Sequence, residues 1–214
     1  ALDAAGVELI DLGGVTVGSL VLSPDGGRGA LFTNASLVEQ ITVVELEQAD
    51  YPRITWPLEK SLRTVKFDPG SDKLLIVHAR AFGDPAEATT FEEFIDRSHG
   101  YSLFDVSTGF AKLQITPVEP TSMVFAPDAS KAYVILDGGD SEGAVAEAQT
   151  IELDTGVVRT TQLGSPPEAL GILPDAAVAF VSQRHPLGRI SFIDIVSGQV
   201  RTLTGFDLNG RVVD

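Results

Sequence analysis

The sequence predicts an all-β fold built from four consecutive repeats of four strands each. Two observations carry this prediction. A proline-centred turn returns along the chain at Pro24, Pro69, Pro127 and Pro174, with spacings of 45, 58 and 47 residues. Each turn lies between two short apolar runs rich in β-branched and aromatic residues, which suit a pleated sheet. Self-similarity at such a period indicates a repeat architecture.

The first strand of each repeat precedes the proline turn. Apolar residues stand four and two positions before each proline, and this period of two predicts a strand with one well-buried face. The pairs are Leu20 and Leu22, Val65 and Phe67, Met123 and Phe125, and Leu170 and Ile172. The turn follows from the proline, which fixes φ, and from the Asp or Gly after it.

Three more strands complete each repeat. The second is expected at 29–33, 73–78, 131–136 and 177–181; the third at 40–47, 100–106, 149–153 and 189–195; the fourth at 53–58, 112–116, 158–163 and 200–204. In three of the four repeats, the third strand runs into an Asp and then a Gly. The glycine supplies the positive φ that a hairpin turn requires. Four hairpin-connected strands in a period of about 45 residues are typical of a β-propeller blade. The alternative, a β-sandwich, gives no reason for a proline turn at every fourth strand.

At these turns the chain resembles the bacterial YVTN-type propeller repeats, whose blades carry a Ser-Pro-Asp-Gly-like turn and an Ile-Asp-x-x-Thr-Gly-like hairpin. The resemblance covers the chain from about Val7 onward. It implies one propeller domain over 1–214, with blades at about 18–58, 61–118, 121–164 and 166–206. It also implies an extracytoplasmic protein, periplasmic, secreted or at the cell surface. It does not define an activity, because the same blade serves enzymes, binders and scaffolds.

The repeat register continues past the four blades. Residues 7–12 match the last strand of an earlier blade, and 211–213 match the start of a further first strand. We therefore expect partial blade strands at both ends and a chain that is the C-terminal part of a larger propeller. A four-bladed ring and a ring completed by self-association are the alternatives.

Composition narrows the classes of partner. Thirty acidic residues against 15 Lys and Arg give a formal net charge of -15, which repels phosphate backbones and anionic headgroups. Nucleic acids and membrane surfaces are therefore poor partners. The chain has no cysteine, which excludes disulfides, thiolate metal sites and thiol nucleophiles. No stretch approaches the roughly 18 consecutive apolar residues of a membrane-spanning helix.

Two loops between second and third strands are longer than the repeat requires, at 81–99 and 138–148. In the first, Thr90 followed by Glu93 forms a capping-box pattern, which predicts a short amphipathic helix. Its apolar face would carry Phe91, Phe94 and Ile95. Such a helix acts as a lid or partner-docking element, or it covers the apolar edge of its own blade.

Seven polar residues of the enlarged loops and of the blade 4 loop are the candidate contact surface for a protein or a small ligand. They are Asp96, Arg97, His99, Asp140, Glu142, Arg184 and His185. We expect the two histidines, Arg184 and Asp96 to share one face of the propeller. The acidic loop at 137–143 lacks the ligand spacing of a calcium loop. No catalytic residue, metal ligand or cofactor is predicted, since no nucleophile, histidine-pair or phosphate-loop motif is present.

The sequence therefore favours a non-enzymatic binding or scaffold module that acts through its enlarged loops. One alternative is a propeller enzyme of the lactonase or quinoprotein type, with a metal held by carboxylates at the channel mouth. The loops entering the first strands hold the charged residues Glu59, Lys60, Arg63, Glu119 and Glu168. Their irregular register indicates ordinary solvated charge. A third alternative is a structural surface-layer repeat, whose loops would form no pocket.

Overall fold

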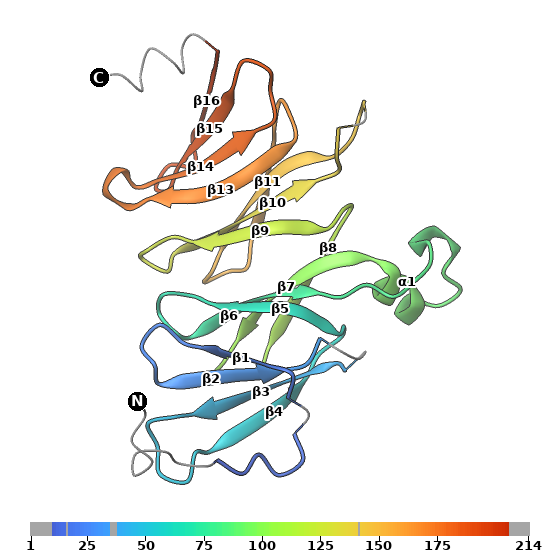
Figure 1. Cartoon of the computed structure of the whole chain (residues 1–214), viewed down its shortest axis with the longest axis vertical. Helices are drawn as coiled ribbons and strands as arrows, with labels where there is room; N and C mark the ends of the chain where they lie inside the picture. Colours follow the sequence, from blue (N-terminus) through green and yellow to red (C-terminus); the bar gives the residue numbers. More distant parts are fainter. Residues whose placement is uncertain (1–9, 16, 35–37, 141, 206–214) are drawn as a thin grey trace, which may run out of the picture.

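The computed structural model describes residues 10–15, 17–34, 38–140 and 142–205, which form four sheets of four antiparallel strands. Within each sheet, the strands lie side by side in the order in which they follow along the chain. Each sheet is therefore one propeller blade, and the blades succeed one another from blade 1 to blade 4 (Figure 1). The predicted all-β architecture is confirmed.

The strand bounds follow the repeat. Blade 1 consists of β1 (Ser19–Leu22), β2 (Arg28–Phe32), β3 (Gln40–Glu45) and β4 (Arg53–Pro57). Blade 2 consists of β5 (Leu62–Phe67), β6 (Lys73–His78), β7 (His99–Asp105) and β8 (Ala111–Thr116). Blade 3 consists of β9 (Pro120–Phe125), β10 (Lys131–Asp137), β11 (Ala146–Glu152) and β12 (Val158–Gln162). Blade 4 consists of β13 (Pro167–Leu173), β14 (Val178–Gln183), β15 (Arg189–Asp194) and β16 (Val200–Thr204).

Each proline turn places one residue in the left-handed conformation. The φ angles are 76° at Gly26, 63° at Ser71, 54° at Ala129 and 48° at Ala177. Glycine adopts this region freely, whereas a side chain there costs roughly 1 kcal/mol. In blade 4 the turn tightens into a short 3-10 helix, η3 (Pro174–Ala176).

The hydrophobic core lies between consecutive blades. Phe32 and Ile41 of blade 1 belong to one buried cluster with Phe67, Ile76 and Phe104 of blade 2, and similar clusters join blades 2 and 3 and blades 3 and 4. The second and third strands of blades 2 and 3 are consequently buried on both faces, which explains their nearly continuous apolar runs. In β14 and β15 of blade 4, buried and partly exposed residues alternate. The outermost strand of blade 1 is mostly exposed.

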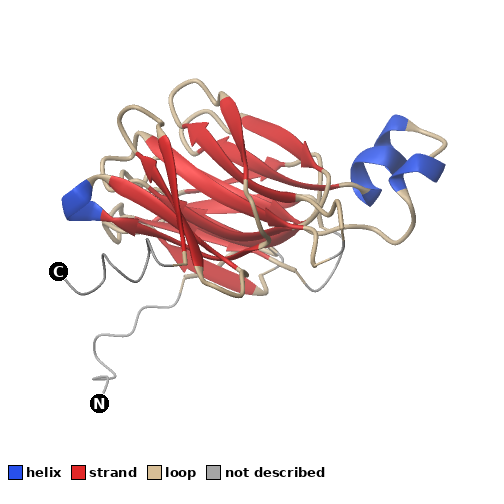
Figure 2. Cartoon of the chain, turned by 90° about the horizontal axis from the view of Figure 1, so that it is seen from above, coloured by secondary structure: helices blue, strands red, loops and turns tan. Residues whose placement is uncertain are grey.

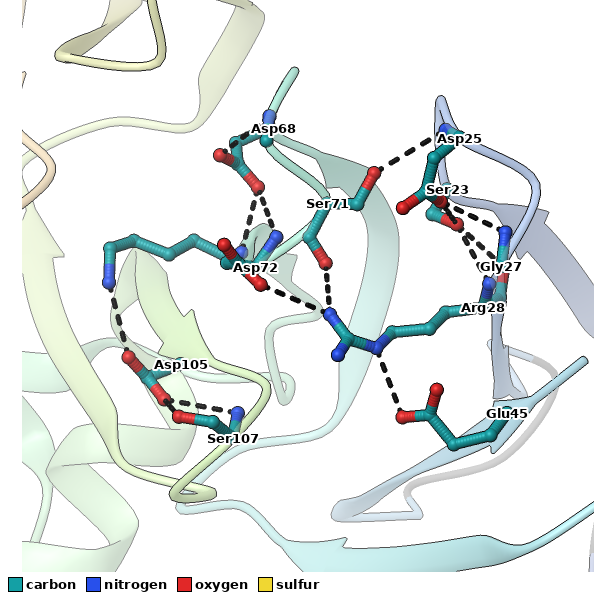
Figure 3. Close-up of polar contacts among 12 residues, drawn as sticks. Ser23, Asp25, Gly27, Arg28, Glu45, Asp68, Ser71, Asp72, Asp105 and Ser107 are labelled. Carbon is teal, nitrogen blue, oxygen red and sulfur yellow. Dashed lines mark hydrogen bonds and ion pairs between the residues drawn. The ribbon is translucent and has the colours of Figure 1, made fainter. Parts of the chain in front are cut away.

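Polar contacts also cross from blade 1 to blade 2. The Nε of Arg28 donates to Glu45 at 3.0 Å across the β2–β3 pair. Its Nη1 reaches the next blade and donates to the carbonyl oxygen of Ser71 at 2.8 Å and to Asp72 at 3.2 Å (Figure 3). The backbone N–H of Asp25 donates to the hydroxyl of Ser71 at 3.4 Å. These contacts fix the two proline turns beside each other.

The hairpin turn after β7 depends on a close approach between blades. The carboxylate of Asp105 accepts hydrogen bonds from the backbone N–H groups of Ser107 and Thr108. Gly109 completes the turn with a φ of 72°, and the indole ring of Trp56 in blade 1 packs on it. A Cβ at position 109 would lie 2.2 Å from that ring, so only glycine fits.

Three expectations from the sequence need correction. The blade 3 loop is shorter than predicted, because β11 begins at Ala146 and the loop spans 138–145 only. His99 is the first residue of β7 and does not lie in the preceding loop. Residues 10–12 of the strand expected at 7–12 form no strand, and the rest of that strand lies outside the described residues. The strand expected at 211–213 also lies outside them.

Candidate partner-binding site

The loop between β6 and β7 of blade 2 forms a small helical unit. It contains a 3-10 helix, η2 (Pro85–Glu87), and a seven-residue α-helix, α1 (Phe91–Arg97). Figures 1 and 2 show this unit extending beyond the rim of the sheets. We call residues 79–98 the blade 2 insert. The predicted helix is therefore present, and it lies at the edge of the propeller.

The helix starts as the sequence indicates, with one difference. The hydroxyl of Thr90 accepts a hydrogen bond from the backbone N–H of Glu93 at 3.1 Å. In a standard capping box the glutamate accepts from the N–H of the cap residue. Here the carboxylate of Glu93 accepts from the N–H and the hydroxyl of Thr89, at 2.7 and 2.8 Å. These hydrogen bonds lower the pKa of Glu93 and tie the first turn of the helix to the residue before its N-cap.

Two cationic side chains fix the C-terminal end of α1. Lys60 lies in the loop between β4 and β5, and it is only 1% exposed. Its Nζ donates hydrogen bonds to the carbonyl oxygens of Ile95 at 2.6 Å and Asp96 at 2.9 Å. The Nε of Arg80 donates to the carbonyl oxygen of Arg97 at 2.7 Å. Cations suit the unpaired carbonyls at this end of a helix. The insert is therefore anchored to the junction of blades 1 and 2.

Burial makes the charge of Lys60 costly. Desolvation lowers the pKa of the Lys60 ammonium group, while the carboxylates of Asp96 and Glu39 oppose this shift. Lys60 is thus not the solvated charge expected from the sequence. Its hydrogen-bond partners lie 35 and 36 residues further along the chain, and no local pattern indicates such a contact.

The insert exposes aromatic side chains. Of the apolar helix face, Ile95 is buried, whereas the side chain of Phe91 is 77% exposed and that of Phe94 is also exposed. The two phenylalanine rings stack with a centroid distance of 6.5 Å. Phe82, in the same insert, is fully exposed. Three exposed phenylalanines on one anchored element are unusual for a solvent face and typical of the centre of a protein interface.

A groove runs beside α1, between the insert and blade 1. Its volume is about 540 Å³, and it combines apolar side chains with a rim of carboxylates. The lining residues are Glu39, Leu58, Glu59, Phe91, Glu92, Ile95 and Asp96. Burial raises the pKa of Glu39, and the neighbouring Asp96 and Glu92 add to this effect. The groove therefore favours a ligand that carries positive charge on an apolar stem.

The predicted site residues divide into two groups. Asp96, Arg97 and His99 lie together on blade 2, where the Nη1 of Arg80 is 3.3 Å from the Nε2 of His99. Arg97 pairs with Glu93 inside the helix. No contact among the described residues joins this group to the loop residues of blades 3 and 4. Arg184 and His185 therefore belong to a separate group of contacts.

The second group joins blade 3 to blade 4. The Nε of Arg184 donates to Asp140 at 2.9 Å, and its Nη2 donates to Asp137 at 2.9 Å. These two carboxylates raise the pKa of the guanidinium group. The imidazole Nδ1 of His185 accepts from the backbone N–H of Leu187, and Glu142 is exposed. Arg184 is thus occupied in an ion pair between blades.

The loops that enter the first strands do not gather carboxylates around one point. Arg63 pairs with Glu119, and Lys60 is occupied by the insert. Among the residues that the structure describes, no group of three or more His, Asp or Glu side chains is placed to hold a metal ion. Within the same residues, no helix is long and apolar enough to span a membrane.

The four blade-like sheets, stacked in chain order, define a β-propeller. Known protein-family models do not match the sequence, and neither do the curated proteins. Solved structures do match the fold. The chain is similar to hydrazine synthase of Kuenenia stuttgartiensis, with a TM-score of 0.54 and 14% identity over 82% of this chain.

Two further solved structures show the same fold. Apo AztD of Citrobacter koseri has a TM-score of 0.56 and 14% identity over 85% of this chain. TolB of Acinetobacter baumannii has a TM-score of 0.50 and 13% identity over 89% of it. The chain spans only 52%, 45% and 43% of the length of these three proteins, in the order given. At this level of identity the likeness establishes the propeller fold alone.

Proposed function

We propose that this propeller is a non-enzymatic binding module that recognises a partner protein through the blade 2 insert. The observation that carries the proposal is the pair of exposed, stacked rings of Phe91 and Phe94 on a helix that buried Lys60 anchors. A surface fixed before binding loses little conformational entropy on association. Aromatic side chains supply most of the energy in such interfaces.

The charge of the insert defines the kind of partner. Carboxylates flank the exposed rings on the groove side, and Asp84 and Glu87 line an open depression beside Phe82. A partner with apolar side chains surrounded by Lys or Arg complements this surface. We place the interaction outside the cytoplasm, as the resemblance to exported YVTN-type propellers suggests.

The test compares two exposed phenylalanines of blade 2. Phe91 lies on the insert, whereas Phe110 is similarly exposed and follows the hairpin turn after β7. A photoreactive phenylalanine analogue at position 91 should cross-link one protein from an extract of the source organism. The analogue at position 110 should not cross-link that protein.

The cross-linked protein is then purified and its affinity measured. Phe91→Ser should raise the dissociation constant by a factor of about 30 or more, which corresponds to the loss of one aromatic anchor. Phe110→Ser should change it by less than about threefold. Equal cross-linking at both positions, or equal effects of the two substitutions, would show that the insert is not the recognition surface.

A further inference from the structure

The groove beside α1 has apolar lining from two separate parts of the chain. Leu58 follows β4 of blade 1, and Ile95 belongs to the helix. Both side chains are nearly buried, at 8% and 9% exposure. The largely exposed ring of Phe91 lines the same groove. An occupant of the groove therefore contacts aliphatic and aromatic surface that blade 1 and the insert provide together.

Four carboxylates line this apolar groove, two from each side. Glu39 directly precedes β3, and Glu59 lies in the loop between β4 and β5. Glu92 and Asp96 belong to α1 and are four positions apart, so they project from the same side of the helix. Among the described residues that line the groove, none carries a positive charge. Its electrostatic complement is therefore a cation.

The carboxylates influence one another across the groove. Burial raises the pKa of Glu39, and the negative charges of Asp96 and Glu92 raise it further. Lys60 opposes this shift, but its buried ammonium group donates to the carbonyl oxygens of Ile95 and Asp96. A cation that enters from solvent would relieve the repulsion between the two sides. Electrostatic attraction is stronger at such a partly desolvated position than at an open surface.

The lining residues suit an alkylammonium group better than a metal ion or a guanidinium group. Among the described residues, the carboxylates are not grouped to hold a metal ion, which also gains nothing from apolar lining. A planar guanidinium group fits a single carboxylate in its own plane. An ammonium group can turn its three N–H donors towards carboxylates on different sides, while its alkyl stem packs on apolar surface.

We infer that the groove receives a lysine side chain of the partner protein that docks on the insert. The inference rests on the proposed function and names the partner residue that the groove selects. The stem of this lysine packs on Leu58 and Phe91. Its ammonium group lies between Glu39 on one side and Glu92 and Asp96 on the other. The exposed rings then supply apolar contact area, and the charged pair fixes which surface of the partner is accepted.

The first experiment uses butylammonium chloride, a compound that reproduces the lysine side chain. Methyl NMR signals of Leu58 and Ile95 report on the groove of the unmodified chain. We expect both signals to shift and to saturate as the compound is added. Ammonium chloride lacks the stem and butanol lacks the charge, so neither should give a saturating shift. Equal responses to the three compounds, or no saturation with butylammonium, would overturn the inference.

Charge-neutral variants locate the binding. Glu39→Gln with Glu92→Gln should weaken butylammonium binding at least about tenfold, because one carboxylate is lost from each side. Glu47→Gln with Glu168→Gln removes the same charge at exposed positions elsewhere and should change binding less than about twofold. If circular dichroism shows that the first variant is unfolded, Glu59→Gln with Glu92→Gln replaces it. Equal weakening by the groove variant and its control would show non-specific attraction only.

The second experiment separates this inference from the proposed function and uses the protein cross-linked at position 91. Glu39→Gln with Glu92→Gln should raise its dissociation constant about tenfold. Replacing the partner lysine nearest the cross-link with Met should remove this dependence, as in a double-mutant cycle. If Phe91→Ser weakens binding and the glutamate variant does not, the lysine inference fails and the proposed function stands, even where free butylammonium binds. If neither variant weakens binding, both fail.

Discussion

Replacing Lys60 with Met should release helix α1 from the propeller and accelerate amide exchange in residues 91–98 by a factor of about 100. The side chain keeps its volume, so little packing is lost. The carbonyl oxygens of Ile95 and Asp96 each lose a charged donor but keep a backbone donor, from Ser98 and Ala81 respectively. A hydrogen bond to a charged group contributes about 1.5–3 kcal/mol, and a total near 3 kcal/mol for the two bonds corresponds to that factor. Hydrogen exchange followed by mass spectrometry measures the change.

The control is Lys66→Met. The ammonium group of Lys66 also donates to a backbone carbonyl, that of Met123 at 3.3 Å, but from an exposed position. Its replacement should alter exchange by less than about threefold, because exposed polar groups regain hydrogen bonds from water. If Lys60→Met leaves exchange in α1 unchanged, then Lys60 does not anchor the insert.

Acidification from pH 7 to pH 4 should lower the free energy of unfolding by roughly 3 kcal/mol through His78 alone. Burial lowers the pKa of His78 to about 4, against 6.5 for an exposed histidine. Between these values the unfolded state binds one proton more than the folded state. Stability is therefore complete above pH 6.5 and falls as the pH drops towards 4.

The hydrogen bonds of His78 support this sign. Its Nδ1 lies 3.2 Å from the carbonyl oxygen of Ser61, and its Nε2 lies 2.7 Å from the hydroxyl of Ser102. A carbonyl only accepts, so Nδ1 carries the proton and Nε2 accepts from Ser102. Both ring nitrogens are thus satisfied in the neutral form, and the charged form gains no new partner to offset its desolvation.

Urea unfolding at pH 7 and pH 4 measures the effect. His78→Gln should lose roughly 3 kcal/mol less than the wild type over this interval. The lowered pKa of His99 acts in the same direction and is common to both proteins. Turn carboxylates with lowered pKa values, such as Asp128, contribute mainly below about pH 4. Identical pH dependence of wild type and His78→Gln would contradict the account.

The fold could be predicted from sequence because its determinants are local. The pair Leu20 and Leu22, and its three equivalents, mark a strand by their spacing of two. The proline turns mark where each strand ends. The helix in the insert was likewise predicted from Thr90 and Glu93, which lie within one turn.

The candidate site could be predicted only in part, because its contacts are distant in sequence. The spacing of Phe91, Phe94 and Ile95 predicts a shared helix face but not that Phe91 and Phe94 face solvent. Lys60 contacts carbonyls 35 and 36 residues away, and Arg184 contacts Asp140 44 residues away. Blade geometry, rather than any motif, decides these pairings. It also separates His99 from His185.

Hydrogen exchange of the chain, alone and bound to the protein cross-linked at position 91, tests partner recognition by the insert most directly. The account predicts that binding slows exchange in residues 79–98 and leaves the turn at 105–110 unchanged. Protection centred on the loop at 137–140 and on Arg184, with no change in residues 79–98, would contradict it.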